Sequence, residues 1–141
     1  MNSPRIWIAI AVLALLVIAA FLWERAGPET GIAPTGPTGS GVRVPPTFSE
    51  AAKRGAVTFD TTCAACHGIN AAGTDVGPPL IHRIYEPSHH SDYAFQFAVV
   101  KGVRAHHWRF GDMPPQQGLS EADVSEITAY VRELQRENGI E

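Results

Sequence analysis

The chain has 141 residues, a formal net charge of −3 and only two cysteines. This length predicts a single folded domain. Residues 48–141 carry eight Lys or Arg against twelve Asp or Glu. The sequence has no basic run and no basic patch with interleaved aromatic residues, so a nucleic-acid partner is not expected.

The first 25 residues (1–25) are predicted to form an N-terminal transmembrane anchor. Residues 6–23, IWIAIAVLALLVIAAFLW, contain no charged side chain, and as a helix they would span roughly 27 Å, close to the hydrocarbon thickness of a bilayer. A cleaved signal peptide is the alternative, but its apolar run is usually only about 7–15 residues long. Arg5 precedes the span and the charges after it cancel, so the N-terminus should stay inside and the remainder should be exported.

Residues 26–47 are rich in Gly, Pro and Thr and are predicted to be a flexible linker. As a flexible coil this segment would reach roughly 25 Å. It is either a spacer with no role beyond its length or a tether that lets a domain swing between fixed partners. The sequence leaves both interpretations open and assigns residues 48–141 to the folded domain.

The folded domain is predicted to open with a helix capped by Thr47, because Thr47 and Glu50 have capping-box spacing. One face of this helix carries apolar or small residues that recur at helical intervals. They are Phe48, Ala51, Ala52, Gly55 and Phe59.

Directly after this helix comes the pentapeptide Cys63-Ala64-Ala65-Cys66-His67. A thioredoxin-like dithiol would need a βαβ pattern, which is missing. A structural zinc site would need further ligands at regular spacing, and a disulfide here would close only a tiny loop. Covalent attachment of one haem c explains all three residues, since Cys63 and Cys66 can bond the two vinyl groups while His67 reaches the iron.

A middle helix is predicted over Ser91–Lys101, closed by Gly102, with Tyr93, Phe97 and Val100 on its inward side. The last helix should begin at the sequence LSEADV (119–124), which supplies an N-cap and an acidic third position. Its buried stripe is predicted to be Val124, Ile127, Val131 and Leu134, with Tyr130 beside it, and Gly139 can end the helix. No segment alternates like a strand, so an all-α domain with long loops is expected.

Apart from the initiator, Met113 is the only methionine, and it stands between a Gly-Asp pair and two prolines. A lone methionine is often a pliable filler of the core. A polar loop does not need such a filler, so Met113 is predicted to be the second axial ligand of the iron. A thioether opposite histidine favours ferrous iron, which suits electron transfer better than oxygen activation.

Five further histidines need a separate interpretation. They are His82, His89, His90, His106 and His107. They are either solvated loop residues, ligands of a bis-His iron, or ligands of a second metal at the surface. Two adjacent histidines do not point the same way without a bend in the chain, which favours the first interpretation.

With its Cys63–His67 pentapeptide and Met113, the chain resembles a membrane-anchored class I c-type cytochrome with one haem and Met–His ligation. The resemblance covers about residues 48–136. The resemblance implies the class I cytochrome c fold, in which the N- and C-terminal helices pack together and loops form the haem crevice. It also implies that Gly55 and Phe59 pack against Tyr130.

The resemblance further assigns roles around the haem. The Pro78 carbonyl, in Gly77-Pro78-Pro79-Leu80, would accept the Nδ1 proton of His67, and Leu80 would lie on the haem face. Trp108 would either donate its indole N–H to a haem propionate or simply pack in the core. Arg104 or Arg109 could neutralise the propionates.

The implied function is that of an electron carrier, not an enzyme, on the periplasmic side of a bacterial inner membrane. It would pass single electrons between respiratory or photosynthetic complexes, with a quinol–cytochrome c reductase as donor and a terminal oxidase or another acceptor. The alternatives are a cytochrome subunit of one larger oxidoreductase complex and a haem enzyme or gas-binding protein.

Overall fold

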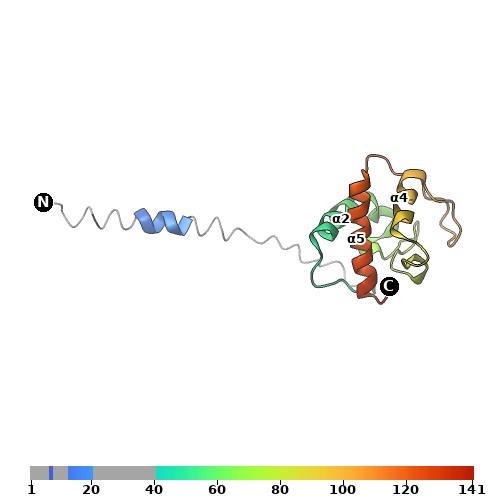
Figure 1. Cartoon of the computed structure of the whole chain (residues 1–141), viewed down its shortest axis with the longest axis horizontal. Coiled ribbons are helices and arrows are strands. Elements are labelled where there is room, and N and C mark those ends of the chain that lie inside the picture. The colour runs from blue at the N-terminus through green and yellow to red at the C-terminus, as the bar shows by residue number, and fades with distance from the viewer. Residues whose placement is uncertain (1–6, 8–12, 21–40) are drawn as a thin grey trace. The chain divides into compact units, whose positions relative to one another are not determined.

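The computed structural model describes Trp7, residues 13–20 and residues 41–141 (Figure 1). The chain divides into two units, residues 1–33 and 34–141. In the first unit residues 13–20 are helical and exposed. The rest of the predicted anchor except Trp7, and linker residues 26–40, lie outside the described residues. No helix in the described parts of the chain has the length and apolar character needed to cross a membrane.

Residues 41–141 are helical with long connections, as predicted. The elements are α2 (Glu50–Thr62), α3 (Ala64–His67), the 3₁₀ turns η1 (Ile69–Ala71) and η2 (Arg83–Tyr85), α4 (Asp92–Lys101) and α5 (Glu121–Glu137). Within this range no strand forms, and Val103 and Met113 make one isolated antiparallel bridge. The N-terminal helix α2 lies beside the C-terminal helix α5 (Figure 1).

The α2–α5 contact forms the core. Phe59 is fully buried, and its ring centroid lies 5.5 Å from that of Tyr130. Gly55 faces the α5 backbone about one turn before Tyr130. A Cβ atom on Gly55 would lie 1.9 Å from the Glu126 carbonyl oxygen, so only glycine lets the two helices approach this closely.

The predicted buried stripe of α5 is confirmed: Val124, Ile127, Tyr130, Val131 and Leu134 are all buried. The N-terminus of α5 is also as predicted. The Ser120 hydroxyl accepts from the Asp123 N–H at 3.2 Å, and the Asp123 carboxylate accepts from the Ser120 N–H at 2.8 Å. This reciprocal capping box fixes where the helix begins.

The predicted cap of the first helix was two residues too early. Ser49, not Thr47, caps α2, and its hydroxyl accepts from the Ala52 N–H at 3.2 Å. A contact with α5 also holds this cap, since the Ser49 N–H donates to the Glu133 carboxylate at 3.0 Å. Phe48 already packs its ring on Tyr130, at a centroid distance of 5.3 Å, before the helix starts.

The side of the middle helix that packs on the core is not the predicted one. The helix α4 begins at Asp92, one residue after the predicted start, and ends at Lys101 with Gly102 as its C-cap, as predicted. Tyr93, Phe97 and Val100, which were predicted to face inward, are 73%, 54% and 61% exposed. The buried side carries Val99 instead, with Phe95 packed partly buried against the core. Nearly every side of α4 is apolar, so periodicity alone could not select the face that meets α5.

The last residues of the predicted linker belong to the folded unit. Arg43 donates from Nε and Nη2 to the Glu137 carbonyl at 3.0 and 2.7 Å, and its backbone exchanges two hydrogen bonds with the Asn138 side chain. Val42 and Val44 pack against the core cluster. The domain therefore begins before residue 48.

Candidate cofactor site

The two cysteines stand on consecutive turns. Cys63 follows the last residue of α2 and its N–H donates to the Phe59 carbonyl at 2.8 Å, while Cys66 and His67 lie on the short helix α3. Both thiols are free, with Cys63 half-buried and Cys66 exposed. Burial, followed by the neighbouring Cys66, raises the pKa of the Cys63 thiol to about 11. Cys63 is therefore a neutral thiol at neutral pH.

A close backbone approach places Pro78 beside this turn. Gly77 is buried against Cys66, and a Cβ atom on Gly77 would lie 2.5 Å from the Cys66 carbonyl oxygen. The Thr74 hydroxyl donates to the same carbonyl at 2.6 Å. The loop that follows α3 is in this way held against the cysteine turn.

The contact between His67 and Pro78 has the geometry that the resemblance implies. Nδ1 of His67 lies 2.9 Å from the Pro78 carbonyl oxygen. A carbonyl can only accept, so Nδ1 carries the proton and Nε2 keeps its lone pair. Burial lowers the pKa of His67, opposed by this hydrogen bond. The ring is therefore a neutral imidazole, which is the form that ligates a metal.

The ring of His67 adjoins a cavity of about 620 Å³. Phe59, Leu80, Phe97, Val99 and Ile127 supply much of its apolar wall. The lining also contains the predicted site residues Cys63, His67 and Met113, and three further histidines. The two-way bridge between the backbones of Met113 and Val103, with both N–H···O distances at 2.9 Å, fixes the backbone of Met113 on this wall. The size and apolar character of the cavity are those of a cofactor pocket.

The remaining predicted site residues are Cys66, Trp108, Arg104 and Arg109, and only two of them line the cavity. Cys66 is exposed and is not part of the cavity lining. Trp108 is half-buried, lines the cavity and donates its indole N–H to the Tyr85 hydroxyl at 3.1 Å. Of the two candidate arginines, Arg104 lines the cavity, whereas Arg109 does not.

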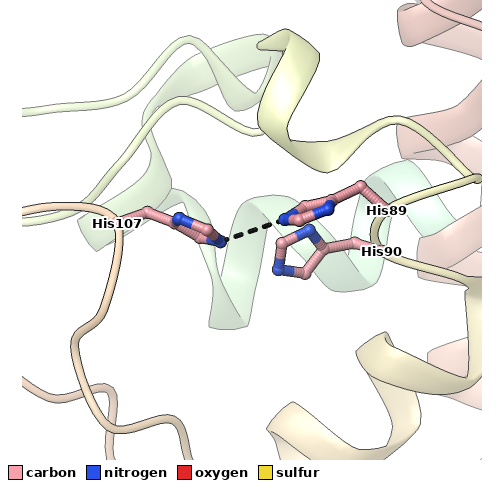
Figure 2. A group of neighbouring side chains, drawn as sticks. All are labelled: His89, His90 and His107. Carbon is pink, nitrogen blue, oxygen red and sulfur yellow. Dashed lines mark hydrogen bonds between the residues drawn. The ribbon is translucent and has the colours of Figure 1, made fainter.

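The cavity wall contains more residues than those assigned to the haem from the sequence. Tyr85, which was not predicted, and Tyr93, Phe97, His90, His106 and His107 all contribute to it. The exposure of Tyr93 and Phe97 has its explanation here, because these rings border the cavity. Three of the spare histidines, His89, His90 and His107, also come together at one place (Figure 2). No sequence signal linked positions 89–90 with position 107.

The site residues fit haem c. Two thiols on adjacent turns can attach a porphyrin, a neutral imidazole follows them, and a thioether stands on the wall of an apolar cavity. Among the described residues, Cys63, Cys66 and His67 do not bring three ligand atoms together, whereas His89, His90 and His107 do, within 4.8 Å of one another. The fold and this site define a c-type haem protein.

Comparison with known families agrees with that class. The model of the family described as Cytochrome c matches residues 52–135, which is more than half of the chain. The chain belongs to the cytochrome c family. Searches of curated proteins and of solved structures gave no match.

Proposed function

We propose that the protein is a monohaem electron carrier with Met–His ligation, tethered to a membrane by its N-terminal segment. The observation that carries this proposal is the common cavity of Cys63, His67 and Met113. Bound haem c would supply one-electron chemistry between ferrous and ferric iron.

The residues around the cavity would set the properties of that couple. His67 is oriented by the Pro78 carbonyl, which raises the basicity of the ring. Met113 would be a second residue that holds the iron, and its thioether would favour the ferrous state. The apolar wall, including Leu80 and Phe97, would restrict water near the iron and so tune the potential.

The cellular setting is part of the proposal. The apolar run of residues 6–23 supports a single-pass anchor in a bacterial inner membrane, with the haem domain facing the periplasm. The partners would be membrane redox complexes, such as a quinol–cytochrome c reductase as donor and a terminal oxidase as acceptor. A tether would raise the local concentration of the domain near such partners.

Carbon monoxide binding to the purified ferrous protein tests the carrier function. A pyridine haemochrome spectrum first establishes one covalently bound haem per chain. A six-coordinate carrier should then show a low-spin ferrous spectrum and bind carbon monoxide slowly or not at all at neutral pH. Rapid, stoichiometric binding would instead identify an open or displaceable sixth position and a gas-binding protein.

A further inference from the structure

Three imidazoles converge at the edge of the cavity, from two segments that are distant in sequence. His89 and His90 follow the turn η2, and His107 lies on the loop between α4 and Met113 (Figure 2). Each histidine offers one ring nitrogen, and the three nitrogens all lie within 4.8 Å of one another. The chain bends at both segments, which removes the expected obstacle to adjacent histidines joining a common site.

The distance between two of these nitrogens is informative. Nε2 of His89 and Nε2 of His107 are 3.4 Å apart. This separation is long for an N–H···N hydrogen bond. Two nitrogens bound to one tetrahedral Zn²⁺ at about 2.0–2.1 Å would lie roughly 3.3–3.4 Å apart. The pair therefore already has the spacing of two ligands on one ion.

The third imidazole has its tautomer set by the backbone. Nδ1 of His90 lies 2.6 Å from the Ile84 carbonyl oxygen, so Nδ1 must donate and Nε2 must carry the lone pair. Burial lowers the pKa of His90, the hydrogen bond to Ile84 opposes this, and the nearby His89, His106 and Arg132 lower it further. The pKa of His107 is lowered by burial and then by the nearby histidines. These shifts favour neutral rings, in agreement with the geometry.

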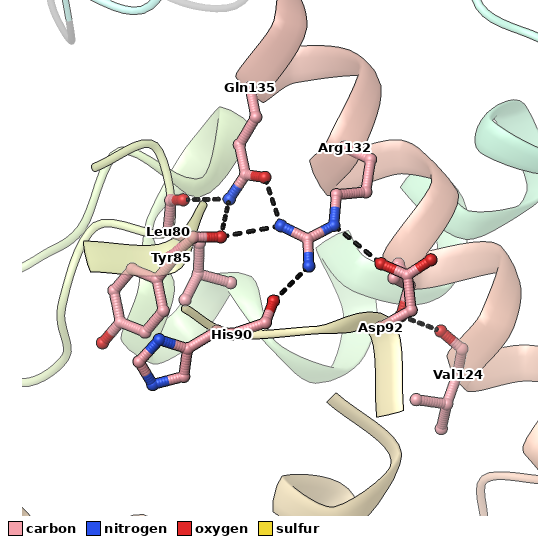
Figure 3. A network of polar contacts seen from close by, with 8 residues as sticks. Leu80, Tyr85, His90, Asp92, Val124, Arg132 and Gln135 are labelled. Atoms are coloured by element: carbon pink, nitrogen blue, oxygen red, sulfur yellow. Dashed lines mark hydrogen bonds and ion pairs between the residues drawn. The ribbon is translucent and has the colours of Figure 1, made fainter. Parts of the chain in front are cut away.

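Both segments are held in place independently of any ion. Arg132 of α5 donates from Nη1 to the Tyr85 carbonyl at 2.7 Å and from Nη2 to the His90 carbonyl (Figure 3). On the other side, the Val103–Met113 bridge closes the loop that carries His107. The Asp112 carboxylate accepts from the Ala105 N–H within that loop at 2.8 Å. A site built on anchored backbone needs little reorganisation to bind its ligand.

We propose that His89, His90 and His107 form a second metal site, distinct from the haem iron, for one divalent transition-metal ion of the Zn²⁺ or Cu²⁺ class. Three imidazoles without a carboxylate suit these ions, whereas Mg²⁺ and Ca²⁺ prefer oxygen ligands. His89 and His107 are exposed, so an ion can enter from solvent and keep a water molecule as a further ligand. His90 and His107 also line the cavity, which places the ion at its rim.

The proposed metal site can be tested directly on the haem-loaded full-length protein in detergent. Titration with Zn²⁺ in a calorimeter should give one ion per chain, and Cu²⁺ should give an electron paramagnetic resonance spectrum with nitrogen hyperfine structure. His89→Ala and His107→Ala should each weaken Zn²⁺ binding by at least about 10–100-fold, because a lost ligand costs no less than a lost outer-shell partner. Both side chains are exposed, so neither change should impair folding.

The matched control is His82→Asn. His82 caps η2 by accepting the Ile84 N–H at 3.2 Å, and asparagine can keep that cap. Zn²⁺ affinity should be unchanged in this variant. The absorption spectrum of the haem should be the same in all three variants as in the parent protein.

Three outcomes would overturn the proposal. They are no stoichiometric ion, an affinity that survives both His89→Ala and His107→Ala, or a changed axial-ligand spectrum in either variant, which would assign the histidines to the iron. The haem content and the carbon monoxide result are measured separately. Failure of the metal site is therefore distinguishable from failure of the carrier function.

Discussion

Arg132 of α5 donates from Nε to the Asp92 carboxylate in the first turn of α4 at 2.8 Å. The Arg132 side chain is 8% exposed, whereas that of Asp92 is 74% exposed. The remaining guanidinium donors point inward, to the carbonyls of Tyr85 and His90 and to the Gln135 side chain (Figure 3). One side chain thereby holds the irregular segment between η2 and α4 against α5.

Replacing Arg132 with methionine should lower the free energy of unfolding by about 2–4 kcal/mol, because partly buried carbonyls and the Gln135 oxygen lose charged donors. Arg132→Lys should recover little of the loss, since an ammonium group cannot reproduce the planar arrangement of donors. Urea denaturation of each variant measures the effect. Arg136→Lys, on an exposed arginine of the same helix, is the control and should stay within about 0.5 kcal/mol of the parent.

Gly55→Ala should lower the free energy of unfolding by about 3 kcal/mol or more, because the new methyl group would overlap the Glu126 carbonyl of α5. The helix propensity of alanine is better than that of glycine, so a loss must come from the helix contact. Thermal unfolding followed by circular dichroism measures it. Val57→Ala, on the same helix at a side chain 61% exposed, should change stability by no more than about 0.5 kcal/mol. Equal stability of parent and Gly55→Ala would contradict the close approach.

Met113→Ala should keep covalent haem but lose the low-spin Met–His spectrum, because Cys63, Cys66 and His67 remain while the thioether is gone. The reduction potential should fall, since the ligand that favours ferrous iron is removed. Absorption spectra and a redox titration measure both effects. A spectrum identical to that of the parent protein would rule out Met113 and direct attention to a histidine of the cavity wall, such as His90 or His106.

Occupying the proposed histidine site should stabilise the folded domain. An ion that binds only the folded chain adds about 2.7 kcal/mol to the free energy of unfolding when its free concentration is 100 times its dissociation constant. The bound ion should also reduce local opening of the loop that carries His107 and Met113. Denaturation with and without Zn²⁺ measures the gain, which His82→Asn should preserve. At the same free Zn²⁺ concentration, a roughly 10–100-fold weaker site in His107→Ala should leave only about 0.4–1.4 kcal/mol of it. Equal stabilisation of His107→Ala would place the ion elsewhere.

The anchor can be tested by fractionation. If residues 6–23 form the proposed anchor, full-length protein should stay in the membrane pellet through an alkaline carbonate wash, because a spanning apolar helix remains in the bilayer. Replacing residues 1–25 with a cleavable signal peptide should release a soluble, haem-loaded periplasmic domain. Full-length protein in the soluble fraction after lysis would contradict the anchor.

Local sequence signals were sufficient to place α5, to place α2 and α4 to within a few residues, and to single out the Cys63–His67 turn. The capping box at Ser120, the apolar stripe of α5 and the Cys63–His67 pentapeptide each depend on residues within a few positions of one another. Spacing alone therefore predicts them. The family resemblance added the contact between His67 and the Pro78 carbonyl, which the structure contains.

Tertiary structure decided the features that depend on residues far apart in the chain. The cap of α2 is Ser49, whose N–H donates to Glu133 of α5, and α4 packs Phe95 against the core cluster and buries Val99. His89 and His107 meet where Arg132 holds one loop and the Val103–Met113 bridge closes the other. Long-range packing and hydrogen bonding set these positions, and they leave no periodicity or spacing in the sequence from which they could be predicted.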